Sequence, residues 1–472
     1  MKDLNDDALK AIIARRDRRF DGRLYFGVKT TRIYCRPVCP AKAKPENILI
    51  FRSPSEAENH GYRPCLRCHP DVAPGSRLLD GTMKTVSRAL RIIHDSADEN
   101  LNVESLACTL GVTDRHLRRL FDEHLGASPI EIMITQRLHF AKQTLQETAL
   151  PVAEVAFASG FRSLRRFNEA FKSRYHSTPT EFRRRRGVAS DDRVSLKIPI
   201  RLPYDWDTLL TFLKRHETYG IELIGGDTYR RFIPQGNTFG SVVIAHRPKQ
   251  DYLSAQFIDV PLTEIRFVLA RIKTLFDTDH NPANMPVTKP LEPRGIRVPA
   301  SFDPFETAVS IILSQLVSTT NAKALLRRLV EQFGQKIGEF SGQPVFAFPS
   351  PAVLATAKVE KVGMTQTRAA AIRELAKAVL AGAINFKAPM DFAVAERKLL
   401  GIKGIGPWTA AMVSMRCLGN PDAFPELDLI VRRALASNLV NPSQWATSRA
   451  YLTHCLWRDY GQTLTKTKGA TP

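Results

Sequence analysis

The chain has 472 residues, more than one hydrophobic core organises, so three or four domains are expected. It carries 68 lysine and arginine residues against 47 aspartate and glutamate residues, and the net charge of +21 indicates a polyanionic partner. No apolar run approaches the length of a membrane-spanning helix, and the first residues lack the apolar core of a signal peptide. These features argue against a membrane partner and predict a cytoplasmic protein.

Residues 1–75 contain four of the seven cysteines, arranged as two close pairs about 25 residues apart. In a cytoplasmic chain, seven cysteines indicate metal binding or reactive thiols rather than disulfides. Two thiolate pairs across a short domain provide the tetrahedral site that zinc favours, so one Zn²⁺ is predicted, with a purely structural zinc site as the alternative. The predicted ligands are Cys35, Cys39, Cys65 and Cys68, and the predicted core thiols are Cys108, Cys417 and Cys455.

The sequence around the two pairs, residues 25–39 and 61–71, closely resembles the Ada-type methylphosphotriester repair domain. The resemblance implies a small zinc-binding α/β domain in which Cys35 accepts a methyl group from a methylated DNA phosphate, because zinc keeps the thiol ionised. Methylation removes one negative charge from the zinc–thiolate cluster, so DNA affinity is expected to rise. Cations surround the pairs, and the predicted DNA contacts among them are Arg36, Arg63 and Arg67.

Residues 76–190 have a helical pattern and contain a repeat, with one copy at residues 103–113 and another at residues 152–161. Each copy has a small residue in its first helix, a turn glycine and an apolar second helix, which indicates two helix-turn-helix units. The repeat resembles the AraC-type DNA-binding domain, which implies an all-α domain on promoter DNA and RNA polymerase as a partner. A basic solvated helical bundle is the alternative. Predicted contacts to DNA in successive major grooves are Arg115, Arg118, Arg165 and Arg166.

Residues 191–296 alternate short apolar strands with two amphipathic helical stretches, at residues 206–216 and 263–276. The pattern predicts an antiparallel sheet with helices on one face. Residues 203–206 resemble the amino-terminal domain that precedes the catalytic part in alkylated-base glycosylases, and a supporting role is expected.

Residues 297–472 are expected to be all-α. An apolar helix opens near residue 302 and ends in Gln315 and Leu316. Further on, Gly404 and Gly406 follow a helical pattern and precede Pro407, which suits the first position of a new helix. A helix, hairpin and helix of this kind presents free N–H groups that bind a phosphate without reading any base. An ordinary helix corner is the alternative.

Asp428 follows the hairpin by about 20 residues, and an N-cap is its common role. Hairpin and aspartate together resemble the helix-hairpin-helix base-excision glycosylases, of the 3-methyladenine glycosylase II type. Trp408 stands where bifunctional members carry a lysine, so only N-glycosidic cleavage is expected. The resemblance implies Asp428 as the catalytic carboxylate and a monovalent cation at the hairpin with DNA. It also implies DNA contacts by Thr409, Gln315 and Leu316, with Leu316 filling the gap of a flipped nucleotide, although a buried core position is the alternative. The implied base pocket is Trp408, Trp457, Met412 and Leu429, with Met412 replacing an aromatic of the family.

The predicted fold class is multidomain α+β, with domains at residues 1–75, 76–190, 191–296 and 297–472. We interpret the chain as a cytoplasmic bacterial monomer that senses methylated double-stranded DNA, activates genes and excises alkylated bases. No remaining cysteine has a Pro-Cys-His-Arg-like context, so no transfer from O6-methylguanine is expected. Two alternatives stay open: an activator with an inactive glycosylase half, and a glycosylase with a purely structural zinc domain.

Overall fold

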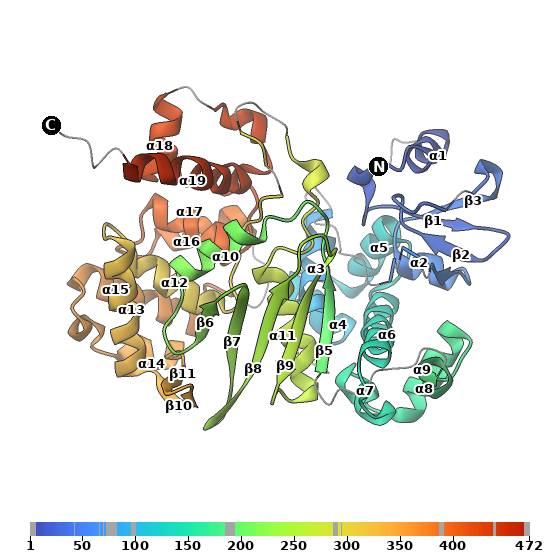
Figure 1. Cartoon of the computed structure of the whole chain (residues 1–472), viewed down its shortest axis with the longest axis horizontal. Coiled ribbons are helices and arrows are strands. Elements are labelled where there is room, and N and C mark those ends of the chain that lie inside the picture. Colours follow the sequence, from blue (N-terminus) through green and yellow to red (C-terminus); the bar gives the residue numbers. More distant parts are fainter. Residues whose placement is uncertain are drawn as a thin grey trace.

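The computed structural model describes residues 6–41, 43–65, 67–68, 70–71, 83–95, 101–184, 194–286, 291–293, 295–386, 391–437 and 440–466. Four units follow one another along the chain and pack together, from a small sheet unit at the right of Figure 1 to a helical unit at its left. The domain boundaries predicted after residues 75 and 190 lie outside the described residues. Among the described residues, no helix combines the length and apolarity needed to cross a bilayer.

The first unit is a four-stranded sheet with the order β3-β1-β2-β4. Strand β1 is antiparallel to both neighbours, and β2 is parallel to β4, which brings the end of β2 at Cys35 close to the second cysteine pair. The elements are α1 (Asp6–Ala14), η1 (Arg18–Phe20), β1 (Tyr25–Val28), β2 (Ile33–Cys35), η2 (Pro45–Asn47), β3 (Ile48–Phe51), α2 (Pro54–Asn59) and β4 (Arg63–Pro64).

The second unit is all-α, with the two helix-turn-helix copies on either side of the long helix α6. In the first copy Gly126 ends α5 in the left-handed conformation that glycine adopts readily. His176 takes the same position after α8 with a φ of +52°, so the substituted residue keeps the turn. The helices are α3 (Met83–Asp95), α4 (Val103–Leu110), α5 (Asp114–Leu125), α6 (Pro129–Glu147), α7 (Val152–Ala158), α8 (Leu164–Tyr175) and α9 (Pro179–Arg184).

A buried carboxylate joins the first two units. The Glu58 side chain on α2 has no exposed surface and accepts hydrogen bonds from Tyr34 Oη at 2.8 Å and from Arg174 on α8. His139 on α6 lies 2.9 Å from the same carboxylate. Burial alone raises the pKa of Glu58, but His139, Arg174 and Tyr34 outweigh it and hold the pKa below its usual value. The carboxylate therefore stays charged and fixes α2 to the long helix α6 and to α8 of the second helix-turn-helix copy.

The third unit is a five-stranded antiparallel sheet with the order β5-β9-β8-β7-β6, as predicted. Helices α10 and α11 share one core with the sheet, and Phe140 of α6 and Ala158 of α7 complete it. The second and third units therefore have a common interior. The elements are β5 (Val194–Pro199), α10 (Trp206–Arg215), β6 (Glu222–Gly225), β7 (Thr228–Gln235), β8 (Thr238–His246), β9 (Tyr252–Ile258), α11 (Leu262–Leu275) and η3 (Pro282–Asn284).

The fourth unit is helical, as expected, and in addition carries a two-stranded hairpin, β10-β11, that the sequence did not reveal. Ile337 and Val345 of this hairpin pack on Phe232 of β7, which explains why short apolar strands form here. The elements are α12 (Pro304–Leu313), α13 (Thr319–Phe333), β10 (Gln335–Phe340), β11 (Gln343–Ala347), α14 (Pro351–Thr356), η4 (Val359–Val362), α15 (Gln366–Leu380), α16 (Phe392–Leu400), α17 (Pro407–Arg416), α18 (Leu429–Ala436), η5 (Pro442–Trp445) and α19 (Arg449–Lys466). The predicted multidomain α+β class is confirmed.

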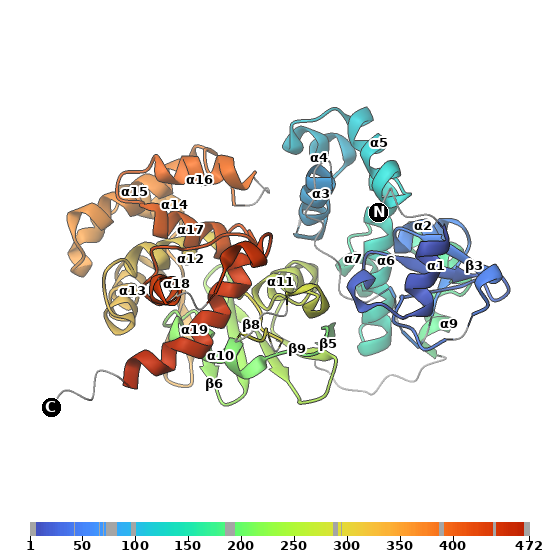
Figure 2. The same ribbon diagram turned by 90° about the horizontal axis from the view of Figure 1, so that it is seen from above.

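Polar contacts between distant segments fix the units to one another. Asp21 of the first unit accepts from Arg201 Nε of the third unit at 2.9 Å. Arg91 of α3 donates Nη1 to the Leu418 carbonyl of the fourth unit at 2.8 Å, and Figure 2 shows α3 beside the helices of that unit. The first two units therefore lie directly on the other two.

We expect Glu58→Gln to destabilise the folded chain by about 3–5 kcal/mol, because it leaves the Arg174 charge half-buried without its carboxylate. Urea unfolding measures the change. Glu169→Gln is the matched control, since Glu169 pairs with Arg165 at the exposed surface, where solvent screens the pair, and its loss should change stability little. Equal losses in the two variants would contradict a buried lock at Glu58.

Candidate functional site

The turn between α16 and α17 depends on one glycine. Gly404 has a φ of +94°, and a Cβ there would lie 3.0 Å from Ala371 Cβ and 3.1 Å from the Thr367 carbonyl oxygen. Gly406 has an ordinary φ of −92° and caps α17 without a side-chain hydrogen bond. The first amides of α17 therefore keep their donors for an external acceptor, and such a helix start suits a DNA phosphate.

Gln315 braces this hairpin from the end of α12. Its Nε2 donates to the Gly404 carbonyl at 2.9 Å and to Thr409 Oγ1 at 2.8 Å, and Thr409 is buried. The side chains of Gln315 and Thr409, both predicted DNA contacts, are thus occupied with each other, and Thr409 does not expose its hydroxyl. The Gly404 carbonyl is engaged by Gln315, and nothing in the described residues supports the predicted monovalent cation.

Leu316 lies in the turn after α12, which ends at Leu313 rather than at the predicted pair. Its side chain is 101% exposed and its φ is +52°. The alternative of a buried core position is therefore wrong for Leu316, and the side chain projects freely from the protein surface.

Asp428 caps α18 through one carboxylate oxygen, Oδ1, and that oxygen also accepts a hydrogen bond from a tryptophan. Its Oδ1 accepts from the amides of Ile430 and Val431 at 3.0 and 3.3 Å, and from Trp457 Nε1 at 3.0 Å. The N-cap interpretation and the active-site interpretation are thus both compatible with the geometry. Among the described residues Oδ2 has no hydrogen-bond partner, so one oxygen orients the group and the other remains available.

The aromatic wall beside Asp428 is built from two units. The Trp457 ring stacks on Phe212 of α10 with centroids 5.9 Å apart and an interplanar angle of 11°, and His454 meets Trp457 edge-on at 4.8 Å. Burial lowers the pKa of His454 to about 3, so this neighbour is neutral at physiological pH. Phe212 escaped the sequence analysis, because an amphipathic helix pattern does not say which residues meet across units.

The other predicted pocket residues are dispersed around this wall. Trp408 is partly buried against the core of the fourth unit, and Met412 lies inside that core. Leu429 follows Asp428 directly and is 59% exposed. Their assignment to a base pocket stays a prediction.

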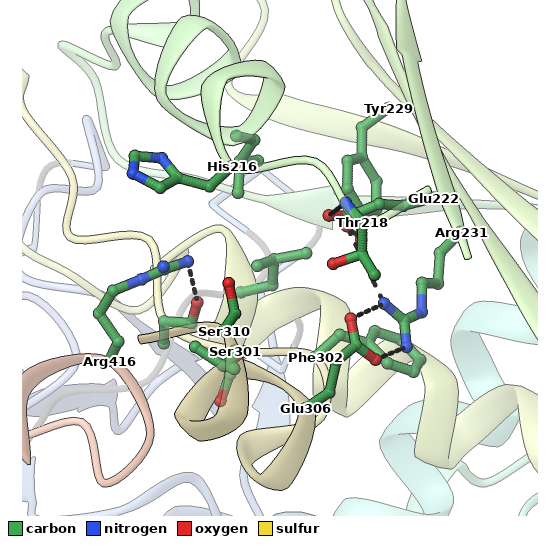
Figure 3. Close-up of a pocket in the computed structure, with 14 residues that line it drawn as sticks. His216, Thr218, Glu222, Tyr229, Arg231, Ser301, Phe302, Glu306, Ser310 and Arg416 are labelled. Carbon is green, nitrogen blue, oxygen red and sulfur yellow. Dashed lines mark hydrogen bonds and ion pairs between the residues drawn. The ribbon is translucent and has the colours of Figure 1, made fainter. Parts of the chain in front are cut away.

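A polar cavity lies between the sheet of the third unit and α12 (Figure 3), and two residues that line it, His216 and Arg416, contact Phe212. Arg231 of β7 donates to both carboxylate oxygens of Glu306 on α12, at 3.0 and 2.6 Å. Burial raises the pKa of Glu222 in the same cavity to about 7. Neither Asp428 nor Trp457 lines the cavity, so it is a polar junction between the units rather than the site around Asp428.

The cysteine cluster forms as predicted. The sulfur atoms of Cys35, Cys39, Cys65 and Cys68 all lie within 4.8 Å of one another. The amides of Arg36 and Arg67 each approach a cluster sulfur at 3.4 Å, the kind of N–H donation that stabilises thiolates. With no metal bound, Cys39 accepts hydrogen bonds from Cys35 and Cys68, which lowers the pKa of Cys39 and raises that of Cys35. Four thiolate donors this close fit a tetrahedral zinc ion.

Of the three cysteines predicted to be core thiols, two are buried and one is exposed. Cys417 and Cys455 are buried core thiols, and burial raises the pKa of Cys455 to about 12. Cys108 is exposed, which corrects its prediction as a core thiol. It lies on the solvent face of α4, opposite the buried Leu106 and Leu110.

The predicted basic contacts are exposed with one exception. Arg36 donates Nε to Asp21 Oδ1 at 2.7 Å and is largely buried, so it braces the first unit instead of facing DNA. Arg118 and Arg165 each pair with an acidic residue one helical turn away, at 3.1 and 2.9 Å. The exposed arginines are Arg63, Arg67, Arg115, Arg118, Arg165 and Arg166.

Four family models match the chain in order. They are the metal binding domain of Ada at residues 8–71, a helix-turn-helix domain at residues 106–185, the AlkA N-terminal domain at residues 195–303, and the HhH-GPD superfamily base excision DNA repair protein at residues 309–451. The first match and the cysteine cluster together support zinc as the metal.

Similar proteins cover both halves of the chain. A Mycobacterium tuberculosis protein named probable bifunctional transcriptional activator/DNA repair enzyme AlkA is 32% identical, over 94% of this chain and 94% of its own length. DNA-3-methyladenine glycosylase 2 of Escherichia coli is 29% identical over 55% of this chain and 95% of its own. The bifunctional transcriptional activator/DNA repair enzyme Ada of Escherichia coli is 35% identical over 27% and 34%.

We expect Cys65→Ser to lose most of the bound zinc and to unfold its unit at a lower temperature, because ligand loss removes metal-linked folding free energy. Metal analysis and thermal unfolding measure both effects. Cys108→Ser, which changes an exposed thiol outside the cluster, should retain zinc and stability. Unchanged zinc content in Cys65→Ser would rule out the four-cysteine site.

Proposed function

The chain belongs to the family of bifunctional transcriptional activators/DNA repair enzymes, and from this premise we propose that it excises alkylated bases at Asp428 and accepts methyl groups from DNA phosphates on Cys35. Its helix-turn-helix and glycosylase units make DNA the partner. The excised bases are proposed to include 3-methyladenine. The observation that carries the proposal is the oriented Asp428 carboxylate beside the aromatic wall.

Hydrolysis of the N-glycosidic bond places positive character on the sugar as the base departs. Asp428 is suited to stabilise it, since Trp457 and two helix amides fix Oδ1 and leave Oδ2 free for the sugar or the attacking water. An alkylated purine is already cationic and leaves without protonation by a general acid. The proposed reaction therefore needs only one carboxylate near C1′.

The same wall favours the base that such a reaction requires. A flipped cationic base gains from stacking on electron-rich rings, and Trp457 and Phe212 provide stacked rings beside Asp428. Trp408 offers no amine for a Schiff base, so the proposed enzyme stops at the abasic site. Leu316 is proposed to fill the place of the flipped nucleotide, because it is exposed and apolar.

Methyl transfer at the cysteine cluster is the second part of the proposal. The Cys35 sulfur forms a bond to the methyl carbon while the carbon–oxygen bond of the phosphotriester breaks, which leaves an ordinary phosphodiester and a thioether. Zinc held by the four cysteines would keep the Cys35 thiol ionised. Loss of one negative charge beside the exposed Arg63 and Arg67 then strengthens phosphate binding, and promoter binding follows. Recruitment of RNA polymerase by a monomer completes the proposed activator.

An activator whose glycosylase half only binds DNA is the competing function. The geometry argues against it, because a binding surface alone has no need of a carboxylate oriented by Trp457. A glycosylase with a structural zinc unit is the other alternative, and methylation of Cys35 distinguishes it.

We expect Asp428→Asn to lower release of 3-methyladenine from methylated DNA by roughly 100- to 1,000-fold, because a neutral amide stabilises the sugar cation poorly. Asparagine also caps helices, so α18 should persist. Chromatography of released bases measures the rate. Glu426→Gln removes a neighbouring exposed carboxylate and should leave the rate nearly unchanged. If Glu426→Gln instead slowed base release and Asp428→Asn did not, Glu426 would be the catalytic carboxylate.

After incubation with methylphosphotriester DNA, we expect mass spectrometry to find one added methyl group on the Cys35 peptide. The exposed Cys108 serves as the internal control and should remain unmodified, because it lacks the zinc that ionises Cys35. An unmodified Cys35 peptide under conditions that release bases would favour the structural-zinc alternative.

A further inference from the structure

Leu316 holds an unusual combination of conformation and exposure. A leucine with a φ of +52° is rare, because the Cβ then crowds its own backbone, and such a residue persists only where its surroundings fix it. The side chain itself contributes nothing to that fixation, since it is 101% exposed. The main chain around Leu316 must therefore supply the constraint, and the residue before it is held most firmly.

Gln315 is fixed at both its side chain and its main chain. Its Nε2 is held by the Gly404 carbonyl and Thr409, at 2.9 and 2.8 Å. Its main-chain carbonyl accepts a hydrogen bond from Nη2 of Arg368 on α15. The peptide group that links Gln315 to Leu316 is thus oriented by Arg368, and that peptide sets the direction in which Leu316 leaves the chain.

Arg368 occupies the turn of α15 that also supports the hairpin. Thr365 caps α15 and accepts from the Arg368 amide at 3.4 Å. Gly404 packs against Thr367 and Ala371, which flank Arg368 along the helix, and a Cβ at Gly404 would lie only 3.0–3.1 Å from them. One turn of α15 therefore sets the relative placement of the hairpin and the Leu316 turn.

The charge of Arg368 has no other evident use in the fold. Among the described residues no carboxylate pairs with it, whereas Arg373, one turn and a half further along α15, donates to Glu360 at 2.7 Å. A half-buried arginine normally gains a carboxylate partner, so its bond to a main-chain carbonyl points to a positioning role.

We propose that Arg368 is a positioning residue for base excision: it orients the Gln315 carbonyl so that Leu316 stays in its left-handed conformation and enters the duplex in place of the flipped nucleotide. This inference rests on the proposed glycosylase function. It predicts that the loss of Arg368 disturbs insertion and the rate of excision through Leu316, with little change in binding to undamaged DNA.

The test uses the full chain with the variants Arg368→Ala, Leu316→Ala and the double variant. Insertion is followed by the fluorescence of 2-aminopurine placed beside a tetrahydrofuran abasic site, and excision by single-turnover release of 3-methyladenine. We expect each single variant to lower the fluorescence change and to slow excision by roughly 10- to 100-fold. The double variant should excise no more slowly than Leu316→Ala, because both changes abolish the same insertion of Leu316 into the duplex.

Two further variants separate positioning from general structure. Arg373→Ala removes a paired arginine from the same helix and should leave insertion unchanged. Arg368→Lys keeps a cationic donor and should recover part of the fluorescence change. Equal losses of insertion in Arg368→Ala and Arg373→Ala would overturn the inference. It would also be overturned if the losses of Arg368→Ala and Leu316→Ala added in the double variant and Arg368→Ala reduced the salt dependence of DNA binding, because these results indicate a phosphate contact.

The two proposals fail in different ways. If the wild-type chain releases no alkylated base and leaves 2-aminopurine undisturbed, the proposed function is at fault. If the wild-type chain does both and Arg368→Ala does them equally well, only the positioning role is overturned.

Discussion

The hydrogen bond between Trp457 Nε1 and Asp428 Oδ1, 3.0 Å long, is the contact on which the proposed chemistry depends. A carboxylate used only as an N-cap would need the two amides of α18 and nothing more. The indole adds a third donor from α19, so three hydrogen bonds fix Oδ1 and none of the described residues engages Oδ2. Because Trp457 in turn stacks on Phe212, the orientation of Asp428 depends on α10 of the preceding unit. The geometry of the candidate site is therefore shared between the third and fourth units.

Ion pairs also join the units elsewhere in the chain. Buried or half-buried ion pairs cross three of the junctions: Glu58 with Arg174, Asp21 with Arg201, and Arg231 with Glu306. Pairs of this kind contribute little net stability, but they penalise any arrangement that leaves one charge unpaired. Their effect is to specify one mutual placement of the units. The cysteine cluster lies close to two of these junctions, because Tyr34 and Arg36 flank Cys35 and reach Glu58 and Asp21.

Local patterns were sufficient for much of the site. The spacing of the four cysteines predicted a cluster whose sulfur atoms do converge, since two short pairs leave few other arrangements. The glycine, proline and aspartate pattern placed the hairpin and the start of α18 correctly. Where the pattern could not decide, the errors were informative. Arg36 was predicted to face DNA and instead pairs with Asp21, Cys108 was predicted to be buried and is exposed, and Phe212 was not identified at all.

The sequence by itself determined the order of the units, the four members of the cysteine cluster and the candidate catalytic carboxylate, because these follow from residue type and local spacing. Tertiary structure alone decided which side chains are available to DNA. Gln315 and Thr409 turn inward to brace the hairpin, whereas Leu316 turns fully outward, although Gln315 and Leu316 are adjacent in the sequence. Burial and hydrogen-bond partners are set by segments that lie tens to hundreds of residues apart, and no local periodicity records them.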